Sequence, residues 1–326
     1  MKILYAVQAT GNGHISRAME LLPYLQQQGT VDIFLSGNNS MLPMDAPVKF
    51  RSKGLSLYYK KNGGLDYLKI LTRLQPIHLK KEICNLPVEK YDLILNDFEF
   101  ITAAACKQKN VPSINFGHQA SFHSSNTPRP EKKNKMGEFV LKNYAVANRY
   151  VGFHFKEYDS FIFPPVIKKE ILNASPQNKN HTTVYLASFG EKQLKEIFKK
   201  IPEVRFDIFC KDILQPKREN HLNFLPVNTS LFNQSLINCA GIITSAGFET
   251  PAEALYLRKA LLCIPIRGQY EQHCNAAALT KMGVTCLPDI SDNFKHQFYK
   301  WAHASKIVEV NYGNTIPNCI DHLFSL

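Results

Sequence analysis

The sequence predicts an α/β protein of two domains, each built on a parallel β-sheet with covering helices. Two observations lead to this prediction. Apolar runs of strand length alternate with segments of helical periodicity, and the alternation begins again after a proline-rich break. The chain has 326 residues, 44% of them hydrophobic, which suffices for two buried cores. We therefore expect domains over 1–155 and 181–326, joined by a linker over 156–180.

Each half of the chain shows the alternation by itself. Expected strands of the first half lie at 3–8, 31–36, 93–96 and 113–116, with helices at 15–28 and 98–109. Expected strands of the second half lie at 183–187, 205–209, 241–244, 260–264 and 284–287, with helices at 191–200, 250–257 and 269–282. The break contains Pro164-Pro165, which continues neither a helix nor a central strand. Ligands of open parallel sheets bind beyond the carboxyl ends of the strands, so the following loops are the candidate sites.

Composition narrows the class of protein. No apolar stretch reaches the ~18 residues of a membrane span. The polar residues after Gln8 make the start a first strand rather than a signal peptide, so we expect a cytoplasmic protein. The eight cysteines form no C-x-x-C pair, which argues against a metal site. The net charge of +12 suits an anionic substrate, lipid or nucleic acid, or simply a solvated basic surface.

The first loop reads Gly11-Asn12-Gly13-His14-Ile15-Ser16-Arg17 between a strand and a helix. The glycines allow a tight turn, and the start of the helix offers free N–H groups to anionic ligands. The positive end of the helix dipole favours a neutral imidazole at His14, which can accept a proton as a general base. A capping loop with an incidental histidine is the alternative reading.

Asp97 ends a second expected strand of the same sheet. Carboxyl ends of neighbouring parallel strands lie close together, so Asp97 can pair with His14, orient its ring and stabilise its protonated form. Asp97 can instead cap the helix expected to begin near Phe98.

A second group of polar residues follows the strand at 241–244. Thr250 suits the N-cap of the next helix, Pro251 its first turn, and the N–H groups there make a phosphate site. Glu253 lies one turn further and can accept two hydrogen bonds from a ribose, or it can merely complement the helix dipole. Beyond the strand at 260–264, Gln269, Glu271 and Gln272 offer the mixed donors and acceptors that a sugar needs.

These residues resemble the donor-binding signature of inverting GT-B glycosyltransferases. The pattern G-x-x-[ST]-x-x-E matches Gly247, Thr250 and Glu253. A second pattern, proline followed by [DE]-Q-x-x-N-A, matches Pro265, Glu271, Gln272, Asn275 and Ala276. The family includes the UDP-glycosyltransferases and the N-acetylglucosaminyl transferase of the peptidoglycan lipid intermediate. One departure is Ser245, which stands where many plant-type members have a histidine that contacts the diphosphate.

The resemblance implies two Rossmann-like domains facing across a cleft, the first for the acceptor and the second for the donor. It implies inverting transfer of a hexosyl group from a nucleotide-sugar, expected to be a UDP-sugar, to a hydroxyl, with His14 as general base supported by Asp97. The nucleotide-sugar is a co-substrate, and neither a cofactor nor a metal is expected. The implied donor-binding residues are Ser188, Gly190, Ser245, Gly247, Phe248, Glu249, Thr250, Glu253, Gln269, Glu271 and Gln272. The residues implied on the acceptor side are Gly11, Asn12, Gly13, Arg17 and His118.

Other functions remain open at this point. The UDP-sugar hydrolases of the pseudaminic-acid pathway share a G-x-G-H-x-x-R loop, which Gly11, Gly13, His14 and Arg17 match, so His14 could activate water instead. An epimerase fits less well, because no set of acid and base residues for reversible elimination stands out. A basic nucleic-acid-binding protein is a third class, but no nucleic-acid module is visible, and we expect no nucleic-acid partner.

The stretch 51–81 mixes lysines and arginines with leucines and tyrosines. Such a mixture favours anionic membrane surfaces, so we expect peripheral contact with the inner face of the membrane and a lipid-linked or otherwise anionic acceptor. The alternative is that the leucines pack inward and the lysines are solvated.

Overall fold

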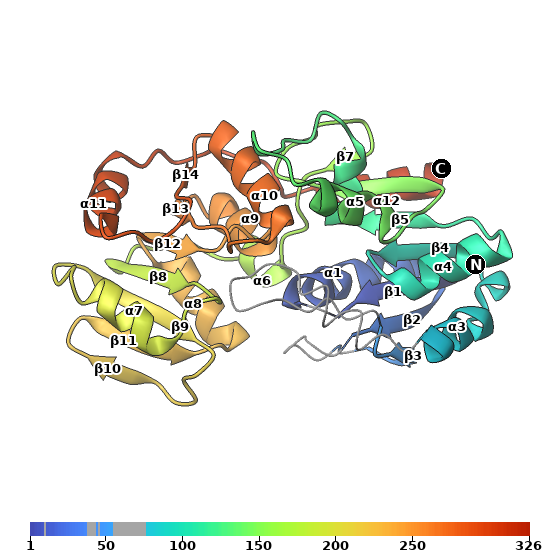
Figure 1. Cartoon of the computed structure of the whole chain (residues 1–326), viewed down its shortest axis with the longest axis horizontal. Coiled ribbons are helices and arrows are strands. Elements are labelled where there is room, and N and C mark those ends of the chain that lie inside the picture. Colours follow the sequence, from blue (N-terminus) through green and yellow to red (C-terminus); the bar gives the residue numbers. More distant parts are fainter. Residues whose placement is uncertain (10, 38–43, 45, 55–75) are drawn as a thin grey trace. The chain divides into compact units, whose positions relative to one another are not determined.

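The computed structural model describes residues 1–9, 11–37, 44, 46–54 and 76–326, which form two compact units (Figure 1). Unit 1 comprises Met1–Thr127, Lys132–Lys168 and Tyr312–Leu326. Unit 2 comprises Pro128–Glu131 and Lys169–Asn311. Among the described residues, no helix has the length and apolar character that a membrane span requires.

Unit 1 is a parallel sheet of strand order β3-β2-β1-β4-β5-β6-β7 with helices packed on it. Its strands are β1 (Lys2–Gln8), β2 (Thr30–Ser36), β3 (Val48–Ser52), β4 (Leu93–Asp97), β5 (Ile114–Gly117), β6 (Arg149–Phe153) and β7 (Ile162–Phe163). Its helices are α1 (Asn12–Gln28), α3 (Pro76–Asn85), α4 (Phe100–Lys109), α5 (Lys135–Asn143) and α12 (Thr315–Ser325). Strand β1 is buried on both faces from its second residue onward, which explains why it reads as a continuous apolar run.

Unit 2 is a second sheet, of order β10-β11-β9-β8-β12-β13-β14, parallel except for the antiparallel pair β10–β11. Its strands are β8 (His181–Tyr185), β9 (Arg205–Cys210), β10 (Lys217–Glu219), β11 (Leu222–Pro226), β12 (Gly241–Thr244), β13 (Ala260–Cys263) and β14 (Thr285–Cys286). Its helices are α6 (Lys169–Leu172), α7 (Glu191–Phe198), α8 (Thr229–Asn238), α9 (Glu249–Tyr256), α10 (Tyr270–Lys281) and α11 (Phe294–Ala304).

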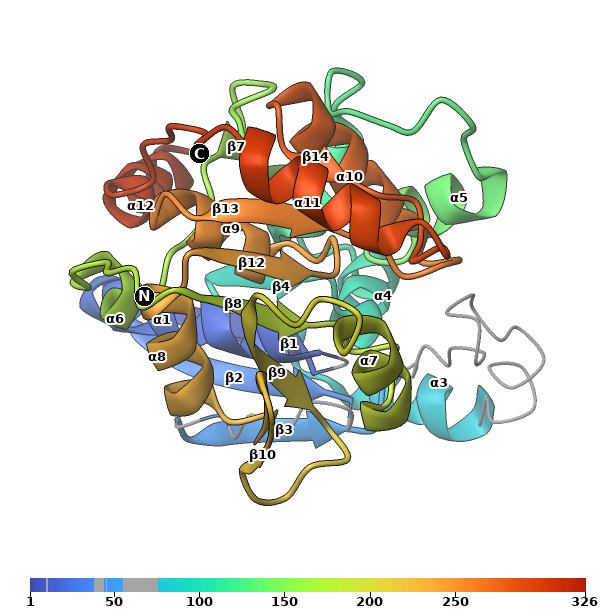
Figure 2. The same ribbon diagram turned by 90° about the vertical axis from the view of Figure 1, so that its left-hand side faces the viewer.

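Helices α7 and α8 lie on opposite sides of β8 and β9 (Figure 2). Successive residues of a strand point to opposite faces of its sheet. Accordingly Val184 of β8 belongs to the core that contains α7 and α11, whereas Thr183 contacts Ser235 of α8. The α7 face is packed with aromatic side chains such as Phe198, Phe206 and Phe298.

The C-terminal segment belongs to unit 1, which corrects the expectation that 181–326 forms one domain. Helix α12 packs beside α1 and β7 and buries Ile316, Ile320 and Leu323. The Tyr312 hydroxyl donates to the Phe155 carbonyl oxygen at 2.8 Å. The expected linker is also divided, because the chain passes into unit 2 at Lys169, where α6 begins.

Candidate functional site

Helix α1 starts immediately after the end of β1 and carries the first group of candidate residues. Gly11 is its N-cap, and Asn12 and Gly13 lie in its first turn. Gly11 is extended, with φ −156°, and a Cβ there would meet nothing within 4 Å. The backbone at Gly11 therefore does not require a glycine, and the space beside it is open.

His14 and Arg17 both contact Asp97 at the end of β4. Nδ1 of His14 lies 2.9 Å from Oδ1 of Asp97. The Arg17 guanidinium donates to both carboxylate oxygens, each at 2.8 Å. Asp97 is fully buried and Arg17 is 3% exposed, whereas the His14 side chain is 13% exposed. The predicted pairing of His14 with Asp97 is confirmed, and Arg17 completes the cluster.

The hydrogen bonds determine which nitrogen of His14 carries the proton. An ionised carboxylate only accepts, so Nδ1–H donates to Asp97. Arg17, whose nitrogen lies 3.2 Å from Nδ1, is then a close neighbour rather than a donor to the ring. Nε2 keeps its lone pair, and among the described residues it has no hydrogen-bond partner.

Asp97 is held in its ionised form by this cluster. Burial by itself raises the pKa of a carboxyl group. The charges and hydrogen bonds of Arg17 and His14 outweigh burial and hold the pKa of Asp97 below its usual value. Asp97 is thus a fixed negative charge behind His14 at neutral pH.

Glu99, not Asp97, caps helix α4, so the capping alternative for Asp97 is wrong. The helix begins at Phe100, and the Glu99 carboxylate accepts from the N–H groups of Ile101 at 2.8 Å and Thr102 at 2.6 Å. Glu99 is fully buried, and burial raises its pKa despite these bonds. Because Glu99 caps the helix, both carboxylate oxygens of Asp97 are available to His14 and Arg17.

Gly117, the last residue of β5, belongs to the candidate site and was missed by sequence reasoning. A Cβ there would lie 2.2 Å from Oδ1 of Asp97 and 3.6 Å from a guanidinium nitrogen of Arg17. Only glycine therefore leaves room for the carboxylate in its observed position. The one signal in the sequence is a glycine at the carboxyl end of an expected strand.

The structure places His118 away from the surface, in contrast to its expected contact with an acceptor. It is 1% exposed, and its Nδ1 lies 2.9 Å from the Phe153 carbonyl oxygen. Its ring centroid is 5.1 Å from those of both Phe122 and His154. His118 is thus a core histidine of unit 1.

In unit 2, the loop after β12 leads into α9, the expected phosphate-binding helix. The N-cap lies two residues earlier than expected: Phe248 is the N-cap, Glu249 the first residue, and Thr250 lies in the first turn. A Cβ on Gly247 would meet nothing within 4 Å, so space is open in front of this turn. Glu253 lies one turn in and is 3% exposed.

Side-chain amides of α10 bind the loop before α9 and the loop after β13. Asn275 donates to the Ala246 carbonyl oxygen at 3.2 Å, which connects α10 to the loop before α9. Gln272 accepts from the N–H of Ile266 and donates to Oε1 of Gln269, both at 2.9 Å. Gln269 and Gln272 therefore shape the loop before α10, and Glu271 lies in the first turn of that helix.

The loop after β8 lies at the same carboxyl-terminal edge of the sheet as the loops before α9 and α10. Gly190 is the N-cap of α7, and its N–H donates to the Gln193 side chain at 3.1 Å. Ser188 is exposed in the same loop. The N–H of Ser245 lies 3.4 Å from the Tyr185 carbonyl oxygen, which brings the loops after β8 and β12 together.

Known structures define the class to which this arrangement belongs. The chain matches UGT89C1 of Arabidopsis thaliana complexed with quercetin at a TM-score of 0.64 and 13% identity, over 99% of this chain and 98% of that one. MurG of Acinetobacter baumannii matches at 0.57 and 14% identity, over 100% and 99%. SnogD of Streptomyces nogalater matches at 0.54 and 13% identity, over 100% and 95%. The fold is that of the GT-B glycosyltransferases.

A family model settles the assignment further. The model of glycosyl transferase family 1 matches residues 1–300, and the chain belongs to that family. The protein is therefore a glycosyltransferase. No curated protein matches the chain in a sequence comparison.

Proposed function

We propose that the protein transfers a hexosyl group from a nucleotide-sugar to an acceptor hydroxyl, with inversion at the anomeric carbon. The proposed donor is a UDP-sugar. The observation that carries the proposal is the buried Asp97–Arg17 pair behind a partly exposed His14. Among the solved structures that resemble the chain, one is UGT89C1 complexed with UDP-L-rhamnose, which supports the choice of donor.

His14 is the proposed general base. Its Nε2 accepts the proton of the acceptor hydroxyl while the hydroxyl oxygen attacks the anomeric carbon. The bond from that carbon to the diphosphate oxygen breaks on the opposite face, and the nucleoside diphosphate leaves with the electron pair. Asp97 holds the ring through Nδ1 and stabilises the imidazolium, and Arg17 keeps the carboxylate ionised and fixed.

The proposed donor site is the edge of unit 2 built by the loops after β8, β12 and β13. The open space at Gly247 lies before the first turn of α9, whose N–H groups can meet the charge of the diphosphate. Glu253 is assigned to the ribose and Glu271 to hydroxyls of the donor sugar. We propose that no metal takes part; activity that EDTA abolishes and added metal restores would contradict this.

Glu253→Ala tests the donor site. Loss of hydrogen bonds to a carboxylate should weaken nucleotide-sugar binding by about 2–4 kcal/mol. Isothermal titration calorimetry measures this affinity, and Glu309→Ala, which removes an exposed glutamate of unit 2, is the matched control. Equal donor affinity in the wild type and the Glu253 variant would remove Glu253 from the site.

We also propose a lipid-linked or otherwise anionic acceptor, reached by peripheral contact with the inner face of the membrane. Most of the stretch 51–81 lies outside the described residues, but α5 carries a similar combination. Its Phe139 is 61% and its Met136 50% exposed, next to Lys135 and Lys142. Basic and apolar side chains together favour anionic bilayers, and each lysine near the surface contributes about 1 kcal/mol.

The experiment for the function as a whole separates transfer from hydrolysis. The protein is incubated with a panel of nucleotide-sugars, with and without lipid-linked and soluble acceptors, and the release of nucleotide and of free sugar is followed. Transfer predicts a new glycoside of inverted anomeric configuration that forms only with acceptor. Release of free sugar at the same rate without acceptor would identify a hydrolase in which His14 activates water.

A further inference from the structure

Unit 2 contains a cavity of about 450 Å³ that none of the proposed donor residues lines. It lies on the face of the sheet that carries α8, over β9 and β11. His181 and Arg205 on its border are the first residues of β8 and β9, whereas Ser188 and Ser245 follow the last residues of β8 and β12. The cavity therefore reaches the edge of the sheet opposite to the proposed donor site. Its volume suits a small metabolite.

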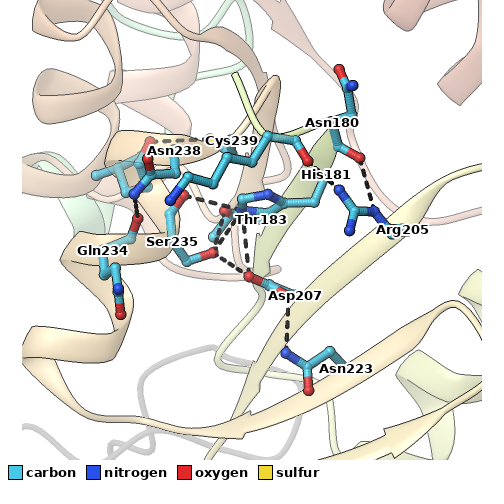
Figure 3. A network of polar contacts seen from close by, with 12 residues as sticks. Asn180, His181, Thr183, Arg205, Asp207, Asn223, Gln234, Ser235, Asn238 and Cys239 are labelled. Atoms are coloured by element: carbon cyan, nitrogen blue, oxygen red, sulfur yellow. Dashed lines mark hydrogen bonds and ion pairs between the residues drawn. The ribbon is translucent and has the colours of Figure 1, made fainter. Parts of the chain in front are cut away.

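A polar network forms the floor of the cavity (Figure 3). Asp207 of β9 accepts from Asn223 at 3.0 Å and from the Ser235 hydroxyl at 2.9 Å. The Ser235 hydroxyl is in turn 2.8 Å from that of Thr183, and His181 lies 3.4 Å from the Asp207 carboxylate. Both oxygens of Asp207 are thus satisfied by partners within the floor, which holds the carboxylate in place beneath the cavity.

Positive charge dominates the border of the cavity. Lys179, Arg205 and Arg218 line it, and Asp207 is the only carboxylate among its described lining residues. Within the described part of the chain, none of these three cations has a carboxylate within 4.0 Å. Arg205 donates to the carbonyl oxygens of Lys179 and Asn180, so its guanidinium is fixed beside the cavity. These three cations line one cavity and have no carboxylate partner, so together they can bind an anion.

The side of the cavity formed by α8 carries side-chain amides, and the backbone N–H of Lys179 donates to the Asn238 carbonyl oxygen there at 2.8 Å. Figure 3 shows Gln234 and Asn238 of α8 on the other side of the network from Arg205. Both line the cavity near the carboxyl end of α8. Their side-chain amides can donate and accept hydrogen bonds, and the last carbonyl oxygens of the helix can accept them. This side matches hydroxyl groups rather than a second negative charge.

We propose that this cavity is a second ligand site, which binds a small molecule with a phosphate group at one end and several hydroxyl groups at the other. The phosphate lies near the side-chain cations of Arg205, Arg218 and Lys179, and the hydroxyls face Gln234 and Asn238 of α8. A sugar phosphate is the simplest member of this class. The site is independent of the proposed transfer reaction, because it uses neither the loops around α9 nor His14.

Calorimetric titration of the full-length protein with glucose 6-phosphate, inorganic phosphate and glucose tests the proposal. Lys179→Ala combined with Arg218→Ala removes two cations of the border and spares Arg205, whose side chain holds the backbone at Lys179 and Asn180. Lys211→Ala combined with Lys300→Ala removes two exposed cations elsewhere on unit 2 and is the matched control. Glu253→Ala tests whether the ligand occupies the donor loops instead.

We expect saturable binding of glucose 6-phosphate that is about tenfold to hundredfold weaker in the Lys179/Arg218 variant and unchanged in the other two. Unchanged melting temperatures show that the variants are folded. The proposal is overturned if glucose 6-phosphate does not bind, if the Lys179/Arg218 variant binds it as tightly as the wild type, or if the control or Glu253 variant loses affinity equally. Inorganic phosphate binding as tightly as glucose 6-phosphate would contradict the assignment of the hydroxyl side.

Discussion

At the scale of single residues, the chemistry that we propose for unit 1 depends on a buried carboxylate that its neighbours keep ionised. Asp97 has no exposed surface, and its two oxygens are shared by His14 and Arg17. Breaking such a pair leaves an uncompensated charge in the interior, which costs about 3–5 kcal/mol. The same contacts that position His14 therefore also contribute to the stability of the unit.

Asp97→Asn tests this double role through its pH dependence. The folded-state pKa of Asp97 is lowered from 3.8, so its stabilising contribution is present above about pH 4 and is lost as the pH falls through the folded value. The free energy of unfolding of the wild type should exceed that of the variant by a constant amount near neutrality. The difference should shrink in acid. Urea unfolding at a series of pH values measures it, and a difference that grows on acidification would contradict the account.

Gly117→Ala tests the space that Asp97 needs. The new methyl group would overlap Oδ1 of Asp97, so the carboxylate must move and its contacts with His14 and Arg17 must weaken. We expect a loss of about 1–3 kcal/mol in stability, as for other overpacked sites, and reduced transfer activity. Gly11→Ala, where the added Cβ meets nothing within 4 Å, is the control for stability. Equal unfolding free energies of the two variants would show that Gly117 has no special role.

Sequence reasoning predicted the meeting of His14 and Asp97 because both follow neighbouring strands of a parallel sheet. It did not predict the burial of His118, because the sequence does not show that the residues after β5 turn into a 3₁₀ helix, His118–His123, packed in the core. It also missed Glu99 as the cap of α4, since a glutamate two residues after Asp97 has no distinctive spacing.

At the scale of the elements, the sequence predicted most strands of the two sheets and missed β3, β6, β7, β10 and β11. Strands such as β1, β8 and β12 are buried on both faces and were expected. Strands β3 and β10, with the sequences VKFRS and KRE, lie at the edges of their sheets, where burial does not impose an apolar pattern. The N-cap of α9 was placed two residues too late, because threonine is a common N-cap residue but the loop ends at Phe248.

Helix α12 is an element whose partner the sequence does not reveal. Its apolar stripe predicts that it packs on a surface, but the surface belongs to unit 1 rather than to the unit that precedes it in the chain.

Leu323→Ala tests that placement. Leu323 is 3% exposed, so its truncation should destabilise unit 1 by about 2–5 kcal/mol. Hydrogen exchange should accelerate in α1 and β7, which α12 contacts, and remain unchanged in α7 and α11 of unit 2. Leu326→Ala, at a position 42% exposed, is the control. Faster exchange confined to unit 2 would contradict the assignment of α12.

At the scale of the whole molecule, the chain is a glycosyltransferase of the GT-B fold, with an Asp97–Arg17–His14 cluster in unit 1 and, in unit 2, the loops to which we assign the donor. The sequence predicted both units because each repeats the strand–helix alternation. It did not predict the return of the chain to unit 1, because that crossing depends on the packing of one helix.

The most direct test of the central claim compares His14→Ala with the wild type in sugar transfer. Loss of the base should lower kcat by roughly 10²–10⁴ while donor affinity stays nearly unchanged. His303→Ala, which removes an exposed histidine of α11 outside every proposed site, is the control and should retain full activity. Turnover of the His14 variant at the wild-type rate, with donor bound, would contradict the role assigned to His14 and Asp97.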